Sequence, residues 1–517
     1  MRFPFIAGTL LVITLAAQAE PLIGFRKQPD PHPYSPNDAV VMALADAQGL
    51  PDEIRHTTRY LALHNIPIAD RFDVVQCLNF CLNSLSRRRS ITFVVPVQGS
   101  NGAVMRVNLD EYGMNHDAWE NLAIKGSGPV RISKKTDQPE EFFYSVVQSK
   151  TKTVKKQRQQ TKNGKLLFYD VGTPNEKPAM EDYEETVVES AAPPWIDLAA
   201  MTSLQTSTKS GYPILRADWF IANATMTPAY NEIMGFKTLK DFQEFVRFRE
   251  RDLDRATKGI VVDSQEVALH QRAILVTPTS LGRYHETYDY FDSRGERNLL
   301  KDLVKKRRDA GEVFAEGPNG LQFFALINGK DEIIDFADPA IATDQSTPWR
   351  NKLVYGGLTS CVTCHVDGAK AVADEVRALT APPFGLLTRA DEKKKAEEVK
   401  DLFFSGGIDD LITATKAVNL SRVSIATKGL TPTKNSAMLR KLFVGYWQGT
   451  LTLDDAAREV GSTAAEIRPL ITALKSPSPD PTLTQLIANR PVRRDMFMDG
   501  GYQQLAAIVY QLKRTQP

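Results

Sequence analysis

Tyr355-Gly-Gly-Leu-Thr-Ser-Cys-Val-Thr-Cys-His365 is the stretch on which the interpretation of this 517-residue chain depends. Its last five residues place two thiols three positions apart, Cys361 and Cys364, and follow them at once with the imidazole of His365. A thiol is a strong nucleophile when ionised, and a neutral imidazole is a common metal ligand. The residues before Cys361 are rich in glycine and hydroxyl side chains, which is typical of a loop. We expect the chemistry of the chain to lie here.

The spacing Cys-x-x-Cys-His lets two thiols add across the two vinyl groups of one porphyrin while the next residue reaches its iron. Cys361 and Cys364 are therefore predicted to bind haem c covalently, and His365 to be the proximal ligand of the iron. The sequence has one such motif, so one haem is expected.

Three other sites compete for the same residues. A thioredoxin-type dithiol would need a βαβ setting and a reactive N-terminal thiol. A zinc site would need a fourth ligand, and the nearest other histidine is His285, far upstream. An iron–sulfur cluster would need two more thiolates, which only Cys77 and Cys81 could supply. Haem attachment is the interpretation that the local spacing favours.

The motif resembles that of c-type cytochromes, and haem is attached to such motifs outside the cytoplasm. The wider chain resembles large, poorly characterised exported bacterial proteins with one cytochrome-c-like haem site. The resemblance covers most of the chain and is carried by stretches at 82–86, 110–119, 216–220, 317–322, 357–365 and 492–497. It implies a shared scaffold, and it assigns a role only to Cys361, Cys364 and His365.

The distal iron ligand is less defined. By resemblance to small cytochromes c, a downstream methionine is expected, first Met438 and then Met496 or Met498. Met438 lies on an apolar helix face, where core packing is the simpler role. His285 and His270 are upstream alternatives, and a five-coordinate iron would favour ligand binding or peroxide chemistry.

The N-terminus has the pattern of a secretory signal. Arg2 precedes an apolar run over 5–17, and Ala17-Gln-Ala19 supplies a small-residue cleavage site before Glu20. We expect a signal peptide cleaved after Ala19 and a periplasmic or otherwise exported protein; an uncleaved anchor is the alternative. No later segment approaches the ~18 apolar residues of a membrane helix, so no integral membrane segment is expected.

Charge and cysteine content limit the other function classes. Lys and Arg total 64 against 62 acids, so no net field favours nucleic acid. Residues 452–474 could form a helix-turn-helix, but the second helix has few basic residues, and no nucleic-acid partner is predicted. Four cysteines are too few for a disulfide scaffold. Cys77 and Cys81, one helical turn apart, are expected to be buried thiols rather than a strained disulfide.

The predicted architecture is multidomain. A signal peptide (1–19) precedes an α+β N-terminal domain (20–205) with a charged insertion at about 133–205, which is either a solvated surface or a docking patch for an acidic partner. A central α+β domain (206–345) follows. Residues 346–517 are expected to form a mainly α, cytochrome-c-like haem domain.

Local patterns predict several individual elements. They are helices over 55–85 with a break at Pro67, a hairpin over 90–97 and 104–109, a helix over 239–253, strands over 260–262, 274–276, 321–327 and 333–336, a helix over 437–447, and two short helices in 452–474.

Three functions remain open at this stage. The first is electron transfer with a periplasmic redox partner protein. The second is a haem enzyme whose iron keeps an open position for peroxide or another small ligand. The third is a binding module over 20–345 with an appended haem domain, considered because a one-haem carrier needs only about 100 residues.

Overall fold

The structure is a computed structural model of the whole chain. It describes residues 36–66, 68–125, 131–135, 138–143, 198–261, 272–290, 308–339, 341–343, 353–370, 408–447, 449–460, 462–474, 479–497 and, in part, 501–509. The predicted signal peptide (1–19) and most of the predicted insertion lie outside the described residues.

The N-terminal part combines helices with a four-stranded sheet of order β2-β3-β1-β6. Strand β1 is antiparallel to β3 and parallel to β6, so the sheet joins segments on both sides of the boundary predicted at 205. The elements of this part are α1 (Pro36–Gln48), α2 (Asp52–Thr57), β1 (Thr58–Ala62), α3 (Ile68–Asn83), β2 (Val95–Pro96), β3 (Val104–Asn108), α4 (Leu109–Tyr112), α5 (His116–Lys125), β4 (Arg131–Lys135), β5 (Gln138–Phe143), α6 (Leu198–Thr208) and β6 (Ile214–Arg216).

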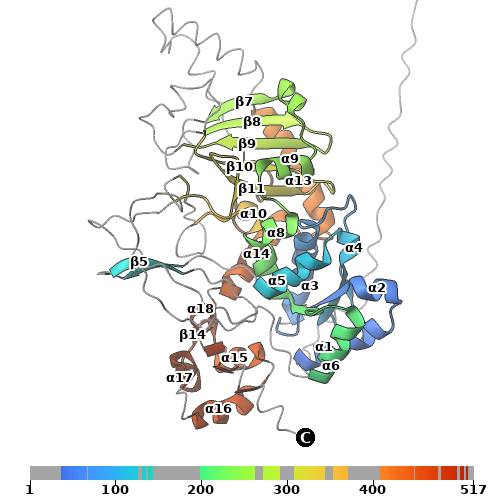
Figure 1. Cartoon of the computed structure of the whole chain (residues 1–517), viewed down its shortest axis with the longest axis vertical. Helices are drawn as coiled ribbons and strands as arrows, with labels where there is room; N and C mark the ends of the chain where they lie inside the picture. The colour runs from blue at the N-terminus through green and yellow to red at the C-terminus, as the bar shows by residue number, and fades with distance from the viewer. Residues whose placement is uncertain are drawn as a thin grey trace, which may run out of the picture.

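The central part is built around an antiparallel six-stranded sheet in the order β12-β11-β10-β9-β8-β7. This sheet lies at the top of Figure 1, above α10 and α14. Its elements and the helices before it are α7 (Ala217–Ala224), α8 (Ala229–Met234), α9 (Leu239–Phe245), η1 (Glu250–Arg255), β7 (Thr257–Val261), β8 (Arg272–Pro278), β9 (Arg283–Tyr288), β10 (Ala310–Glu316), β11 (Gln322–Asn328) and β12 (Ile333–Ile334).

The two faces of this sheet have different neighbours because successive side chains of a strand point to opposite sides. On one face, Phe323 of β11 packs against Phe245 of α9, with ring centroids 4.8 Å apart. On the other face, Phe314 of β10 and Phe324 of β11 contact the ring of His365, which directly follows α10 (Leu358–Cys364). The second face therefore holds the site described below.

Helix α10 is fixed at its N-terminus by one carbonyl. The backbone N–H groups of Leu358 and Thr359 donate to the oxygen of Thr225, at 2.9 and 3.3 Å. Gly357, the residue before the helix, has φ +78°, and a Cβ there would lie 2.8 Å from the same oxygen and 2.8 Å from the Tyr230 ring. Only glycine allows this close approach without strain.

The C-terminal part is mainly helical in the described residues. Helix α14 packs against α10, α7 and α3. The elements beyond it, of which α15, α16 and α17 lie at the bottom of Figure 1, have an apolar core of their own. The elements are α13 (Asp409–Ala426), α14 (Pro432–Trp447), β13 (Thr450–Leu451), α15 (Leu453–Glu459), α16 (Ala464–Ala473), α17 (Pro481–Ile487), β14 (Val492–Arg493) and α18 (Arg494–Met496).

A buried group of charges joins these C-terminal elements to the rest of the chain. Glu459 binds both Arg216 and Arg494, and Arg216 also pairs with Asp218. All four side chains are at least nine-tenths buried. Two of the sequence stretches on which the resemblance rests, 216–220 and 492–497, thus meet at one place.

The mixed α+β character predicted from the sequence is confirmed. Among the described residues, one apolar cluster runs from Leu61 to Tyr446, across the boundaries predicted at 205 and 345. None of the described helices combines the length and the apolar character that crossing a membrane requires.

Individual elements were predicted with uneven success. Helices α3, α14, α15 and α16, the β2–β3 pairing, and parts of strands β7, β8, β11 and β12 agree with the predictions. The predicted helix over 239–253 ends at Phe245 and resumes as the 3-10 helix η1. One prediction was wrong, because the helical pattern over 55–85 includes strand β1. Strands β9 and β10 were not predicted.

The close contact at Gly357 gives a stability prediction. Gly357→Ala should lower the free energy of unfolding by about 2–4 kcal/mol, because it combines an unfavourable φ with overpacking. Gly429 is the matched control: its φ is +94°, but a Cβ there meets nothing within 4 Å, so Gly429→Ala should lose only about 1 kcal/mol. Thermal or urea unfolding of the two variants measures the difference, and equal losses would contradict the contact.

Candidate functional site

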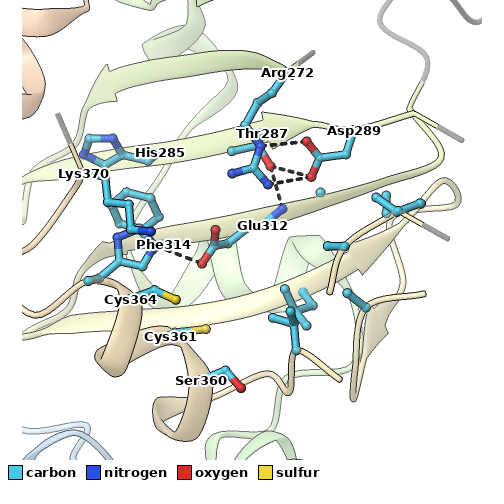
Figure 2. Close-up of a pocket in the computed structure, with 18 of the residues that line it drawn as sticks. Arg272, His285, Thr287, Asp289, Glu312, Phe314, Ser360, Cys361, Cys364 and Lys370 are labelled. Atoms are coloured by element: carbon cyan, nitrogen blue, oxygen red, sulfur yellow. Dashed lines mark hydrogen bonds and ion pairs between the residues drawn. The ribbon is translucent and has the colours of Figure 1, made fainter. Parts of the chain in front are cut away.

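A cavity lies between α10 and the sheet face that carries Phe314 (Figure 2). It is lined by the sheet, by α10 and the turn after it, and by Ile412 of α13. The motif residues Cys361, Cys364 and His365 all contribute to its wall. The structure thus brings the three residues singled out by the sequence to one cavity.

His365 is held in a defined orientation. It ends α10, and its Nδ1 lies 3.2 Å from the carbonyl oxygen of Gly368, whose own N–H donates back to the His365 carbonyl at 3.0 Å. A carbonyl can only accept a hydrogen bond, so this contact places a hydrogen on Nδ1. The other ring nitrogen, Nε2, lies 3.3 Å from Oε1 of Glu312.

The two cysteines occupy successive turns of α10 and differ in exposure. Cys361 is 3% exposed, whereas Cys364 is partly exposed. Burial raises the pKa of the Cys361 thiol well above its ordinary value, and the nearby Glu312 and Cys364 add to the effect. The Cys361 thiol therefore remains protonated at neutral pH.

The floor of the cavity carries polar groups on alternate positions of neighbouring strands. Arg272 of β8 forms a two-bond ion pair with Asp289, with both N–O distances 2.8 Å. Burial opposes ionisation of Glu312 on β10, but His365, Arg272 and Lys370 outweigh it and lower the pKa of that carboxyl to about 2. Figure 2 shows these groups pointing into the cavity.

His285 of β9 lines the same cavity. Its ring stacks on Phe314, with centroids 4.3 Å apart and planes 6° apart. The side chain is 1% exposed, and its Nε2 has no hydrogen-bond partner among the described residues. Burial, with a smaller contribution from His365, lowers the pKa of His285 to about 3.

The other predicted site residues lie elsewhere. Met438 packs at the edge of the main apolar cluster and is not among the described residues that line the cavity. Met496 is 49% exposed, and Met498 and His270 lie outside the described residues. Within the described part of the chain, no group of three or more His, Cys, Asp or Glu is arranged to hold a metal ion.

Cys77 and Cys81 are not among the described residues that line the cavity. Both are fully buried on α3, within the main apolar cluster, and they are not joined by a disulfide. This agrees with the prediction that they are buried core thiols. Burial raises the pKa of the Cys77 thiol well above its ordinary value.

Sequence reasoning missed the polar groups that face the motif, above all Glu312 and the Arg272–Asp289 pair. The only available signal was a weak one: Ala310-Gly-Glu-Val-Phe-Ala-Glu316 alternates in a way that puts Glu312 and Phe314 on one face of a strand. Its glycine and two acids made the segment a poor strand candidate.

Comparison with protein-family models, with curated proteins and with solved structures finds no match to this chain.

The buried, neutral His285 predicts a pH dependence for the haem-free chain. The unfolded chain takes up a proton on His285 near pH 6.5, but the folded chain does so only near pH 3, so acidification favours unfolding across that range. At pH 5 the penalty from this residue is about 2 kcal/mol. Replacement His285→Phe, which keeps a ring on Phe314, should reduce the loss of stability between pH 7 and pH 5 by that amount in urea unfolding.

His64 offers an independent comparison. It is also buried, and burial together with the charge of Arg216 lowers its pKa to about 3. His64→Phe should reduce the loss of stability between pH 7 and pH 5 by a similar amount. The double variant should show the sum of the two reductions because the sites are separate. An unchanged pH slope in His285→Phe would show that His285 is protonated in the folded chain.

Proposed function

We propose that this chain is an exported c-type cytochrome that carries one covalently bound haem c and transfers electrons to or from a periplasmic redox partner protein. The observation that carries the proposal is the convergence of both motif thiols and the motif imidazole on one cavity. Export remains a prediction from residues 1–19, and a cytochrome-c-like fold for 346–517 remains one from resemblance.

The donor set is consistent with a haem. Cys361 and Cys364 would supply the two thioether bonds, and His365 would bind the iron through Nε2, because Nδ1 is held by the Gly368 carbonyl. Four of the iron's ligands come from the porphyrin, so no larger cluster of protein ligands is required. The bound group would supply a one-electron redox centre.

Two features of the cavity bear on how its residues would hold a haem. Lys370 is a cation on the cavity wall, suited to a carboxylate side chain of a haem, whereas Arg272 is already paired with Asp289. Glu312 lies where the iron would bind His365, so its carboxylate has to withdraw from Nε2. The Gly368 carbonyl keeps the imidazole in place while this happens.

The dithiol alternative is less well supported. A dithiol oxidoreductase depends on a thiolate with a lowered pKa. The Cys361 thiol instead has its pKa raised by burial and by the neighbouring Glu312. The same thiol can still be alkylated during haem attachment, before the chain is fully folded.

A second candidate function is a haem enzyme with an open iron position. It is favoured by one observation: the described residues that line the cavity include no methionine. A thioether would give a six-coordinate electron carrier, whereas its absence leaves room for a small ligand. The next subsection develops this point.

Haem attachment is tested by mass and colour. The full chain, produced in cells able to assemble c-type cytochromes, should gain the mass of one haem and a visible Soret band. Cys361→Ala and Cys364→Ala should each lose one thioether, and the double variant should lose the covalent adduct because no thiol remains at the motif.

Cys77→Ala and Cys81→Ala are the matched controls, since these thiols are buried away from the cavity. Both should retain the full haem mass. A wild-type chain that stays colourless and unmodified under these conditions would rule the proposal out.

A further inference from the structure

The orientation of His365 defines which side of the cavity an iron would face. Nδ1 is occupied by the Gly368 carbonyl, so a metal can bind only at Nε2. Glu312 of β10 lies next to this nitrogen, and the Nε2–Oε1 distance is 3.3 Å. The group opposite the predicted proximal ligand is therefore a carboxylate.

His285 is not placed to take that position. In the sheet, His285 is directly paired with Phe314, and the His365 ring packs over Phe314 and Phe324, at 4.9 and 5.5 Å between centroids. Glu312 lies one cavity-facing position further along β10, and Nε2 faces this position. His285 thus lies beside Phe314, on which the His365 ring packs, whereas Nε2 of His365 faces Glu312.

The main chain of Glu312 is fixed in the sheet, and its carboxylate lies against His365. Its backbone N–H donates to Thr287 Oγ1 at 2.8 Å. Arg272 lies on the same cavity wall, where both of its bonds to Asp289 fix its position. The carboxylate now lies 3.3 Å from Nε2, so it would have to move away from the imidazole to leave room for a haem between the two side chains.

We infer that Glu312 is the distal residue of the haem site and that its carboxylate holds the sixth iron position only weakly. This inference rests on the haem attachment proposed above and deepens it. A carboxylate is a hard oxygen donor and a weaker ligand for haem iron than a thioether or a second imidazole. A bound haem iron would therefore be accessible to small ligands such as carbon monoxide or cyanide, which favours the ligand-binding candidate over a simple carrier.

The test is spectroscopic and uses the full-length, haem-loaded protein. The ferric wild type should show a high-spin spectrum, and the ferrous form should bind carbon monoxide. Glu312→His should give a low-spin spectrum and weaken carbon monoxide binding by roughly tenfold or more, because the second imidazole has to be displaced. Glu312→Gln, nearly the same size, should keep the haem and the fold but change the ferric spectrum.

Met438→Leu is the control because Met438 is not among the described residues that line the cavity, and it should keep the wild-type spectrum and carbon monoxide affinity. A low-spin wild type whose spectrum is unchanged in Glu312→Gln would overturn the inference while leaving haem attachment intact. A low-spin state lost in His285→Phe or Met438→Leu would overturn it too and would identify the true ligand. A chain without attached haem would overturn both proposals.

Discussion

The site depends on how α10 is fixed between the Thr225 carbonyl and the six-stranded sheet. Two backbone N–H groups at the start of the helix share that carbonyl, and the ring of His365 at its end packs on Phe314 and Phe324. An α-helix turns by about 100° per residue, so a shift of one residue would carry the motif side chains out of the cavity. The close approach that prevents this shift is possible only because residue 357 is glycine.

The polar side chains that the sheet contributes to the cavity are not explained by a contribution to the stability of the fold. Burying ionised groups is unfavourable unless they are paired, and apolar residues of similar size would stabilise the sheet at least as well. Arg272 and Asp289 satisfy each other, and Glu312 lies against His365, but Nε2 of His285 has no partner among the described residues. Polar groups kept at such a cost beside a reactive motif indicate a functional site.

The sequence allowed the motif and most of the helices to be predicted, but not the wall opposite the motif. Helix α15 begins with a capping box formed by Thr452 and Asp455, a signal that local sequence carries well. Strand β1 is buried on both faces, so its sequence lacks the alternation of apolar and polar residues that separates a strand from a helix. Strand β9 has polar residues on both faces and no alternation to detect. The contact of Glu312 with His365 joins residues far apart in the chain, which no local pattern encodes.

The arrangement also bears on the size of the chain. A small carrier needs about 100 residues, which left most of this chain without a role. In the structure the cavity wall opposite α10 comes from strands β8 to β12, and α9 supports the far face of that sheet. Residues of the central region thus line the same cavity as the motif. Under the proposed function, groups on a β-sheet would govern access to the iron. That differs from a helical cytochrome, where a thioether from the same small domain closes the site.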